Sequence, residues 1–304
     1  MFSRARLLKA ATLPRAAGGT PALSSLQAET LTWAKPRVLR APCEDLVGHQ
    51  GDTFWLLDGS STPKRLHCPG LKANGAFLVQ HLDFALRALL LLKPDMPLLE
   101  LLALAEEEVG AYLRQLHPEV GPAVLKYAAP HASVVLVRRL PWRIEYALLQ
   151  DATLLVRPGP GAAVQVLKDS RQAEFNADYL ADIAAALRAG DAFGARYAQL
   201  LDEMVDRERE HRNKDGFFTF TGFDDAAAHA VYGEMAITKD SELVLASDGA
   251  ARYWTHFGGA IEDVFRRPLP DVAQAVRDAE AADPEAKTYP RIGAADDIGL
   301  MRVR

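Results

Sequence analysis

The chain has 304 residues, of which 49% are hydrophobic and 25% charged, and its formal net charge is -5 at pH 7. This length accommodates one large domain or two small ones, and the composition is that of a soluble globular protein with a substantial core. The charge gives no general reason to expect nucleic acid or an anionic membrane as a partner. The two cysteines, Cys43 and Cys68, form neither a metal-ligand spacing nor a disulfide framework, which suits a reducing compartment and predicts a cytoplasmic location.

The first 30 residues differ from the rest. Basic residues occur there among small ones, with no acidic residue before Glu29. Such a start is found in organelle transit peptides, but we favour a flexible tail over residues 1–30, followed by one domain over residues 31–304. No later run approaches the roughly 20 apolar residues of a membrane span, because residues 77–92 are interrupted by His81, Asp83 and Arg87.

The first strong element is a strand at residues 54–57, Phe-Trp-Leu-Leu, which ends at Asp58-Gly59. An uninterrupted apolar run of this length predicts a strand buried on both faces. A carboxylate followed by glycine at a strand end lies where a ligand can approach the backbone closely. A plain Asx-Gly turn is the alternative interpretation.

Two helices follow, at residues 71–92 and 98–116. Apolar residues recur at helical spacing in the first, and Pro94 ends it. The short connection predicts an antiparallel helix pair. We interpret the acidic run at residues 106–108 as a solvated helix face.

The middle of the chain predicts strands in quick succession, at residues 133–137, 142–149, 153–156 and 163–167. Tight turns between them favour an antiparallel meander. Asp151 lies in one of these turns, and we interpret it as a turn-capping residue rather than a site acid. Helices are expected next at residues 175–187 and 193–209.

The last third predicts a hairpin formed by residues 231–238 and 242–246, then helices at 250–257 and 270–282 and a final strand at 298–303. Antiparallel strands interrupted by paired helices indicate an α+β fold. We expect a four-layer αββα sandwich in which two antiparallel sheets face each other and each is flanked by a helix pair.

Acidic residues recur at strand ends across this plan. Ser247-Asp248-Gly249 repeats the arrangement of Asp58-Gly59, and Asp296-Asp297 directly precedes the last strand. Carboxylates that converge without cations repel one another and stay protonated. If these converge, they favour hard divalent metal ions with oxygen ligands and bound waters.

In order and spacing, these motifs resemble those of the metal-dependent protein phosphatase 2C family, in its bacterial-type branch, over roughly residues 36–303. Glu44-Asp45 is similar to the family's early acidic pair, and the three Asp motifs above are similar to its Asp-Gly, Ser-Asp-Gly and Asp-Asn-Ile. The resemblance implies the αββα fold. It also implies a metal-dependent serine/threonine protein phosphatase that hydrolyses phosphomonoesters with two Mn2+ or Mg2+ ions.

The resemblance also implies a role for each matching residue. Asp58 would bridge the two metal ions, and the carbonyl group of Gly59 would bind one of them. Asp248 and Asp296 would hold the other ion. Two metal ions can ionise a bridging water near neutral pH and stabilise an in-line displacement at phosphorus, so no covalent enzyme intermediate is needed.

Around these ligands, Glu44 and Asp45 would orient metal-bound waters. Arg40 matches the spacing of the family's phosphate-binding arginine, whose planar fork suits phosphate. The chain departs from the family pattern at residues 60–62, where Ser-Ser-Thr replaces a histidine-containing segment, and at Gly299, where threonine is usual. That histidine is the family's proposed general acid, so the role is either unfilled or taken by a metal-bound water.

The expected partners are a phosphoprotein substrate and a cognate serine/threonine kinase, with no nucleic acid and no membrane. Two alternatives remain. In a haloacid dehalogenase-like phosphatase, Asp58 would be phosphorylated covalently, although Ser60 replaces that family's second aspartate. In a phosphatase-like binding or regulatory module, the metal site would be residual or absent.

Overall fold

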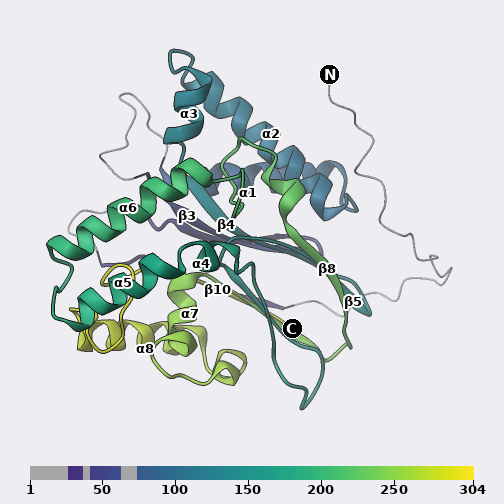
Figure 1. The fold of residues 1–304 in the computed structure, drawn as a ribbon. Coiled ribbons are helices and arrows are strands. Elements are labelled where there is room, and N and C mark those ends of the chain that lie inside the picture. Colours follow the sequence, from purple (N-terminus) through teal and green to yellow (C-terminus); the bar gives the residue numbers. More distant parts are fainter. Residues whose placement is uncertain (1–26, 37–41, 63–73) are drawn as a thin grey trace.

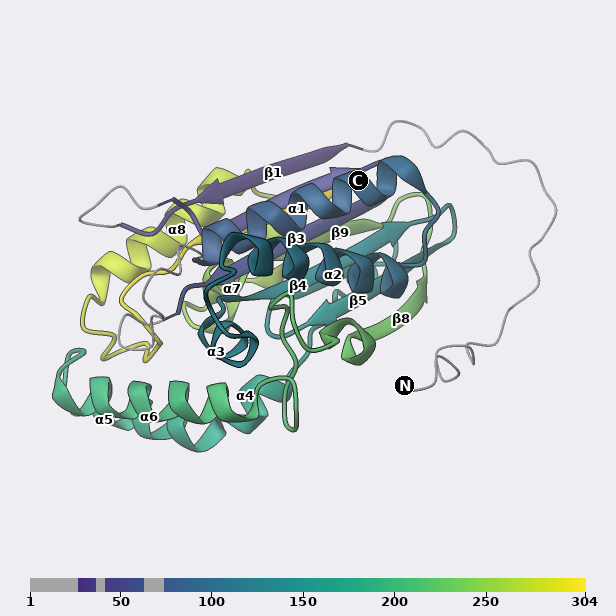
Figure 2. The ribbon, with the colours of Figure 1, turned by 90° about the horizontal axis from the view of Figure 1, so that it is seen from above.

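A computed structural model describes residues 27–36, 42–62 and 74–304, and the statements below concern these residues. Two five-stranded sheets pack face to face (Figures 1 and 2). Sheet A has the order β1 (Ala28–Trp33), β10 (Ile298–Val303), β9 (Glu242–Ala246), β6 (Thr153–Arg157) and β7 (Gln165–Leu167). Sheet B has the order β2 (Asp45–Gln50), β3 (Thr53–Ser60), β4 (His131–Arg139), β5 (Arg143–Leu149) and β8 (Val231–Ala236).

Every neighbouring pair of strands in both sheets is antiparallel. The predicted antiparallel sandwich is confirmed. The haloacid dehalogenase alternative is wrong, because it requires β3 to lie in a parallel sheet. Strand β1 begins at Ala28, within the segment that the sequence predicts to be a tail.

Helices cover both outer faces of the sandwich. On sheet B lie α1 (Gly75–Leu92) and α2 (Leu98–Leu116), with the short α3 (Pro122–Ala128) beyond them. On sheet A lie α7 (Asp248–Thr255), the 3-10 helix η3 (Ile261–Phe265) and α8 (Leu269–Ala282). The described elements therefore form the expected αββα layers.

A third helix group stands apart from these layers. It comprises α4 (Arg171–Phe175), α5 (Ala177–Arg188) and α6 (Ala195–His211). Helices α5 and α6 pack on each other and on Ala286 and Ile292 of the segment after α8. Figure 2 shows the two helices running along one side of the sandwich. The short η2 (Ala226–His229) lies against α2.

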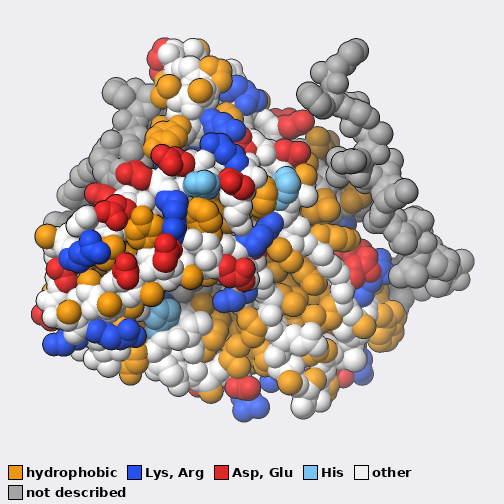
Figure 3. Space-filling model, viewed as in Figure 1, with side chains coloured by type: hydrophobic (Ala, Val, Ile, Leu, Met, Phe, Trp, Pro, Cys, Tyr) orange, Lys and Arg blue, Asp and Glu red, His pale blue; other side chains and the backbone are white. Residues whose placement is uncertain are grey.

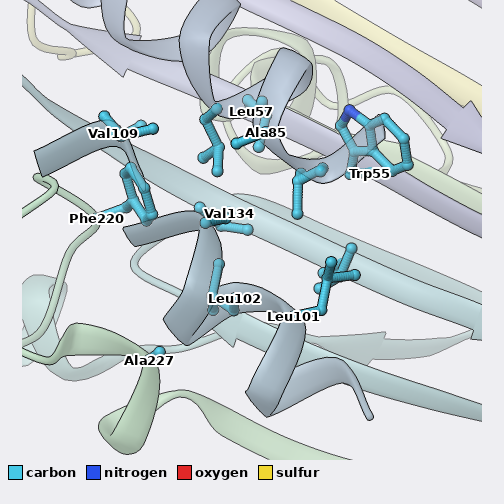
Figure 4. Close-up of a cluster of buried hydrophobic side chains, with 14 of the residues drawn as sticks. Trp55, Leu57, Ala85, Leu101, Leu102, Val109, Val134, Phe220 and Ala227 are labelled. Atoms are coloured by element: carbon cyan, nitrogen blue, oxygen red, sulfur yellow. The ribbon is translucent and has the colours of Figure 1, made fainter. Parts of the chain in front are cut away.

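Strand β3 is buried on both faces, as predicted. Phe54 and Leu56 point into the core between the sheets. Trp55 and Leu57 point the other way, into the core under α1 and α2 (Figure 4). All four side chains are at most 2% exposed. At about 1.5–3 kcal/mol for each large apolar side chain removed from water, this strand is a main source of stability for both cores.

Helix α1 is long and apolar enough to cross a membrane by length and composition. Its side chains Leu78, Leu82 and Leu86 are, however, fully buried in the core that α1 shares with sheet B and α2. Asn74 caps the helix by accepting a hydrogen bond from the backbone N–H of Phe77 at 2.8 Å. Its buried face is that of a core helix.

The predicted meander and the predicted hairpin are both wrong at one connection. Strands β5 and β6 lie in different sheets, and so do β8 and β9. At the first crossing Gln150 adopts a left-handed conformation with φ of 65°. At the second, the Arg139 guanidinium donates hydrogen bonds to the carbonyl groups of Ser241 at 2.7 Å and Lys239 at 3.2 Å. Each crossing carries the chain between the layers, where an ordinary hairpin would have kept it in one sheet.

The predicted solvated face at residues 106–108 is wrong for Glu106. Its side chain is buried beside η2, and Oε2 accepts a hydrogen bond from the backbone N–H of Ala227 at 3.2 Å. Glu107 and Glu108 are exposed, as expected. Burial, with smaller contributions from Asp225 and Asp224, raises the pKa of Glu106 to about 7.

Candidate metal centre

Sheet B brings two of the predicted acids together at the end of β3. The β2–β3 register places Asp45 directly opposite Asp58, and the β3–β4 register places Ser133 on the other side of Asp58. Side chains two positions apart on a strand share a face, and Leu56 faces the core between the sheets. Asp58 therefore projects at the end of the space between the sheets.

Sheet A supplies the other two aspartates. Asp248 is the first residue of α7, directly after β9, and Asp296 comes just before β10. The backbone N–H of Asp248 donates to Oδ2 of Asp58 at 3.3 Å, which joins the acids of the two sheets. Ser247 caps α7, and its Oγ also accepts from the N–H of Gly299 at 2.9 Å, which fixes the turn against β10.

The glycines of the two Asp-Gly motifs are required by close backbone packing. A Cβ atom at Gly59 would lie 2.7 Å from the carbonyl oxygen of Gly75 at the start of α1. A Cβ atom at Gly249 would lie 1.9 Å from the carbonyl oxygen of Asp297. Both distances are shorter than any van der Waals contact, so in each motif the glycine lets a neighbouring segment pack beside the aspartate.

Asp58, Asp248 and Asp296 line one cavity of about 320 Å³. Its acidic wall contains Glu44, Asp58, Asp151, Asp248 and Asp296. Helix α6 forms another wall with Met204, Glu208 and Arg209, and Lys35 and His131 also line the cavity. Figure 3 views the molecule from the side of α5 and α6, where acidic and basic side chains are interspersed. Asp58, Asp248 and Asp296, far apart in sequence, thus share one site.

The carboxyl groups raise one another's pKa values. Burial raises the pKa of Asp58 well above its usual value, and the nearby Asp45 and Asp248 raise it further. Burial, together with the nearby Asp296 and Asp151, raises the pKa of Asp248 to about 7. The pKa of Asp45 is raised well above its usual value, mainly by burial. Acids held together in this way are stabilised by added positive charge.

The chemistry of the donor set fits hard divalent metal ions. All the acidic side chains offer oxygen donors, as Mn2+ and Mg2+ prefer. Oδ2 of the buried Asp45 has no hydrogen-bond partner among the described residues. A Cβ atom at Gly299 would lie 3.2 Å from that oxygen, so glycine leaves room for the Asp45 carboxyl group. Across the described part of the chain, no three acidic, histidine or cysteine side chains are already spaced as a complete ligand set.

Asp151 lies in the cavity although the sequence favoured a turn-capping role. It accepts a hydrogen bond from Oγ of Ser133 at 2.6 Å, and burial raises its pKa. The crossing from β5 to β6 carries it into the space between the sheets. Its position supports the alternative that it is a site acid.

The segment that replaces the family's histidine is tied to the scaffold. Oγ of Ser61 is hydrogen-bonded to Glu44 and accepts from the backbone N–H of Gly75 at 3.0 Å. Oγ of Thr62 donates to the carbonyl group of Ala128 at 2.7 Å. Ser60 lines the cavity directly opposite His131 in the β3–β4 register.

His131 is a cavity residue that the sequence analysis did not identify. Its Nδ1 atom is buried without a hydrogen-bond partner. Burial lowers the pKa of His131 well below its usual value, and Arg209 and Arg212 lower it further. Lys35 was missed as well. Both depend on which strands pair, which the sequence did not reveal. Arg40, the predicted phosphate ligand, lies outside the described residues.

Comparison with known proteins shows the fold. No protein-family model matches the chain, and none of the curated proteins does. Among solved structures, the serine/threonine phosphatase PstP/Ppp of Mycobacterium tuberculosis has 15% identity and a TM-score of 0.54, over 91% of this chain and 97% of that one. The catalytic domain of PstP in complex with two manganese ions has 14% identity and a TM-score of 0.53, over 92% and 98%.

PppA, described as a key regulatory component of T6SS in Pseudomonas aeruginosa, is similar at 14% identity and a TM-score of 0.54, over 93% of this chain and 98% of that one. The chain thus has the fold of bacterial serine/threonine phosphatases, and the similarity covers nearly the whole of those structures. The fold expected from the resemblance to the protein phosphatase 2C family is confirmed.

Proposed function

We propose that this protein is a metal-dependent phosphomonoester hydrolase that dephosphorylates phosphoserine or phosphothreonine in proteins. The observation that carries the proposal is the meeting of Asp58 from sheet B with Asp248 and Asp296 from sheet A in one cavity. These three aspartates were singled out from sequence motifs alone. The fold, which is shared with serine/threonine phosphatases, supports the same assignment.

Two Mn2+ or Mg2+ ions are the expected cofactors, as in the PstP structure that contains two manganese ions. Asp58, Asp248 and Asp296 would hold them, together with the carbonyl group of Gly59, and Glu44 and Asp45 would orient their waters. Bound here, the ions would supply an ionised water as the nucleophile and positive charge for the phosphoryl oxygens.

The residues around the acids suit the rest of the reaction. The lowered pKa of His131 keeps its imidazole neutral near pH 7, so one ring N–H would donate a hydrogen bond to the phosphoryl group or the departing oxygen. Met204 and Leu201 of α6 make one part of the cavity wall apolar. Arg40 would bind the phosphate as a bidentate fork.

The expected partners are phosphoproteins, with a cognate serine/threonine kinase as the opposing enzyme. A cytoplasmic location stays a prediction from the cysteine content. We expect the protein to act in signalling through reversible phosphorylation.

The test is Mn2+-dependent hydrolysis of an aryl phosphate and of a phosphothreonine peptide. Asp58→Asn should abolish turnover of both substrates, because it removes the charge of the bridging ligand. Asp52→Asn is the matched control, since Asp52 is exposed in the turn at the opposite end of the same strand. Undiminished turnover in Asp58→Asn would refute the assignment.

A second candidate is a phosphatase-like module that binds a partner without efficient catalysis. It is favoured by one observation: both carboxylate oxygens of Asp296 are already hydrogen-bonded to cationic side chains. Tight Mn2+ binding without turnover of any phosphopeptide would select this candidate over the first.

A further inference from the structure

Asp296 is held by two cations from different parts of the fold. The ammonium group of Lys35 lies 3.0 Å from Oδ1, and a guanidinium nitrogen of Arg252 lies 2.9 Å from Oδ2. The backbone N–H of Asp297 also donates to Oδ1 at 2.9 Å. Both oxygens of this predicted metal ligand are therefore engaged by protein donors.

Lys35 is brought to the site by the pairing of β1 with β10. Trp33, the last residue of β1, is opposite Ile298, the first residue of β10. The chain just after β1 therefore lies beside the chain just before β10. The backbone N–H of Lys35 donates to Oδ1 of Asp297 at 2.7 Å, which anchors the residue there.

From this anchor the Lys35 ammonium reaches three carboxylates. Besides Asp296, it lies 3.8 Å from Oε2 of Glu44 and 3.9 Å from Oδ2 of Asp297. Its side chain lines the cavity and is 30% exposed. The Lys35 ammonium thus lies in the part of the acid cluster where Asp296 and Glu44 come together.

The two cations differ in how firmly they are held. The Arg252 side chain is 4% exposed and also binds Glu280 at 3.1 Å and the carbonyl group of Ile292 at 2.7 Å. Moving it would break these buried contacts, which is costly. Lys35 has a flexible stem that opens to the cavity, and its ammonium can be rehydrated there. Lys35 is the exchangeable cation, and Arg252 is a fixed one.

We propose that Lys35 is a tethered counter-ion that competes with a divalent metal ion for Asp296. In the metal-free protein its ammonium neutralises the acids nearest to β10. A metal ion that uses Asp296 must displace the ammonium into the cavity, so Lys35 lowers the affinity of the site for that ion. This inference rests on the proposed function, because it requires that divalent ions bind here.

The test is the affinity for Mn2+, measured by titration calorimetry on the full-length chain. Lys35→Met keeps the apolar stem and removes the charge, and should bind Mn2+ about tenfold more tightly, which corresponds to about 1.4 kcal/mol. Lys35→Arg keeps a cation at the site and should stay close to wild type. Lys93→Met is the control, because Lys93 forms an exposed ion pair with Glu100 away from the cavity.

An unchanged or weaker Mn2+ affinity in Lys35→Met, with binding intact in the wild type, would overturn the counter-ion role alone. The absence of Mn2+ binding in all four proteins would overturn the proposed metal-dependent function as well. A second measurement needs no variant. In protein labelled with 13C at lysine Cε, saturating Mg2+ should shift the Lys35 signal and leave that of Lys93 unchanged, and a Lys35 signal that does not respond would contradict displacement.

Discussion

Glu106→Gln should make the protein more stable at pH 8 but not at pH 5. Oε1 of Glu106 has no hydrogen-bond partner, while Oε2 accepts from Ala227, a bond that the glutamine oxygen can keep. Burial first, and then Asp225 and Asp224, raise the pKa of Glu106 from 4.5 to about 7. Lys126 forms an ion pair with Asp224, which limits that contribution.

The direction of the pH dependence follows from the difference in proton binding between the folded and unfolded states. Because the folded state holds this proton more tightly than the unfolded state, the stability due to Glu106 is complete below pH 4.5 and is lost as the pH rises to about 7. At about 1.4 kcal/mol for each pH unit, the loss of stability over this shift is at most about 3.5 kcal/mol. Glutamine does not titrate, so the variant should exceed wild type by up to that amount at pH 8.

The assay is urea denaturation at pH 5 and pH 8 at constant ionic strength. The buried acids of the cavity titrate in the same direction in both proteins, so the difference between variant and wild type isolates Glu106. Glu107→Gln is the control, because Glu107 is exposed on the same helix. Equal free energies of unfolding for wild type and Glu106→Gln at both pH values would show that Glu106 does not hold its proton more tightly in the folded state.

Three further predictions concern the site. Gly249→Ala should lower the free energy of unfolding by about 1–3 kcal/mol or more and weaken Mn2+ binding, because the new Cβ would lie 1.9 Å from the backbone oxygen of Asp297. A free energy of unfolding and a calorimetric Mn2+ affinity that both match wild type would contradict this prediction. Ser247→Ala removes the side-chain cap of α7 and should lower the free energy of unfolding, measured by urea denaturation, by about 1–2 kcal/mol. Mn2+ at about 100 times its dissociation constant should stabilise the protein by about 2.7 kcal/mol. At this chain length that corresponds to a rise in Tm of roughly 5 °C. The Asp248→Asn variant should show no such rise.

The strand at residues 54–57 and the Asp-Gly motifs could be predicted from sequence because their signals are local. Four consecutive apolar residues require burial on both faces, and Phe54 to Leu57 fill two cores. The same signal explains the failures. A strand that is apolar on both faces fits either sheet equally well. The sequence therefore could not reveal that β6 lies in a different sheet from β5, or that β9 lies in a different sheet from β8.

Glu106 could have been recognised as buried. Leu102, Glu106, Val109 and Leu113 follow one another at helical spacing, and all four are buried. The neighbouring Glu107 and Glu108 suggested a solvent-exposed face, although the helical spacing of the apolar residues indicated that Glu106 is buried.

Lys35 and His131 could not have been placed at the site from local patterns. Lys35 reaches Asp296 only because β1 pairs with β10, more than 260 positions further along the chain. His131 faces the cavity because β4 pairs with β3 in a register that sets it opposite Ser60. Such long-range pairings are specified by the whole fold. Asp58 and Asp248, in contrast, can be recognised locally from the glycine and serine residues next to them in the sequence.

In the proposed function, Asp58, Asp248 and Asp296 gather to bind divalent metal ions. The most direct measurement is anomalous X-ray diffraction from a crystal soaked in millimolar Mn2+. We expect anomalous density in the cavity between the carboxylates of Asp58 and Asp248. A fully soaked crystal with no anomalous density there would contradict it.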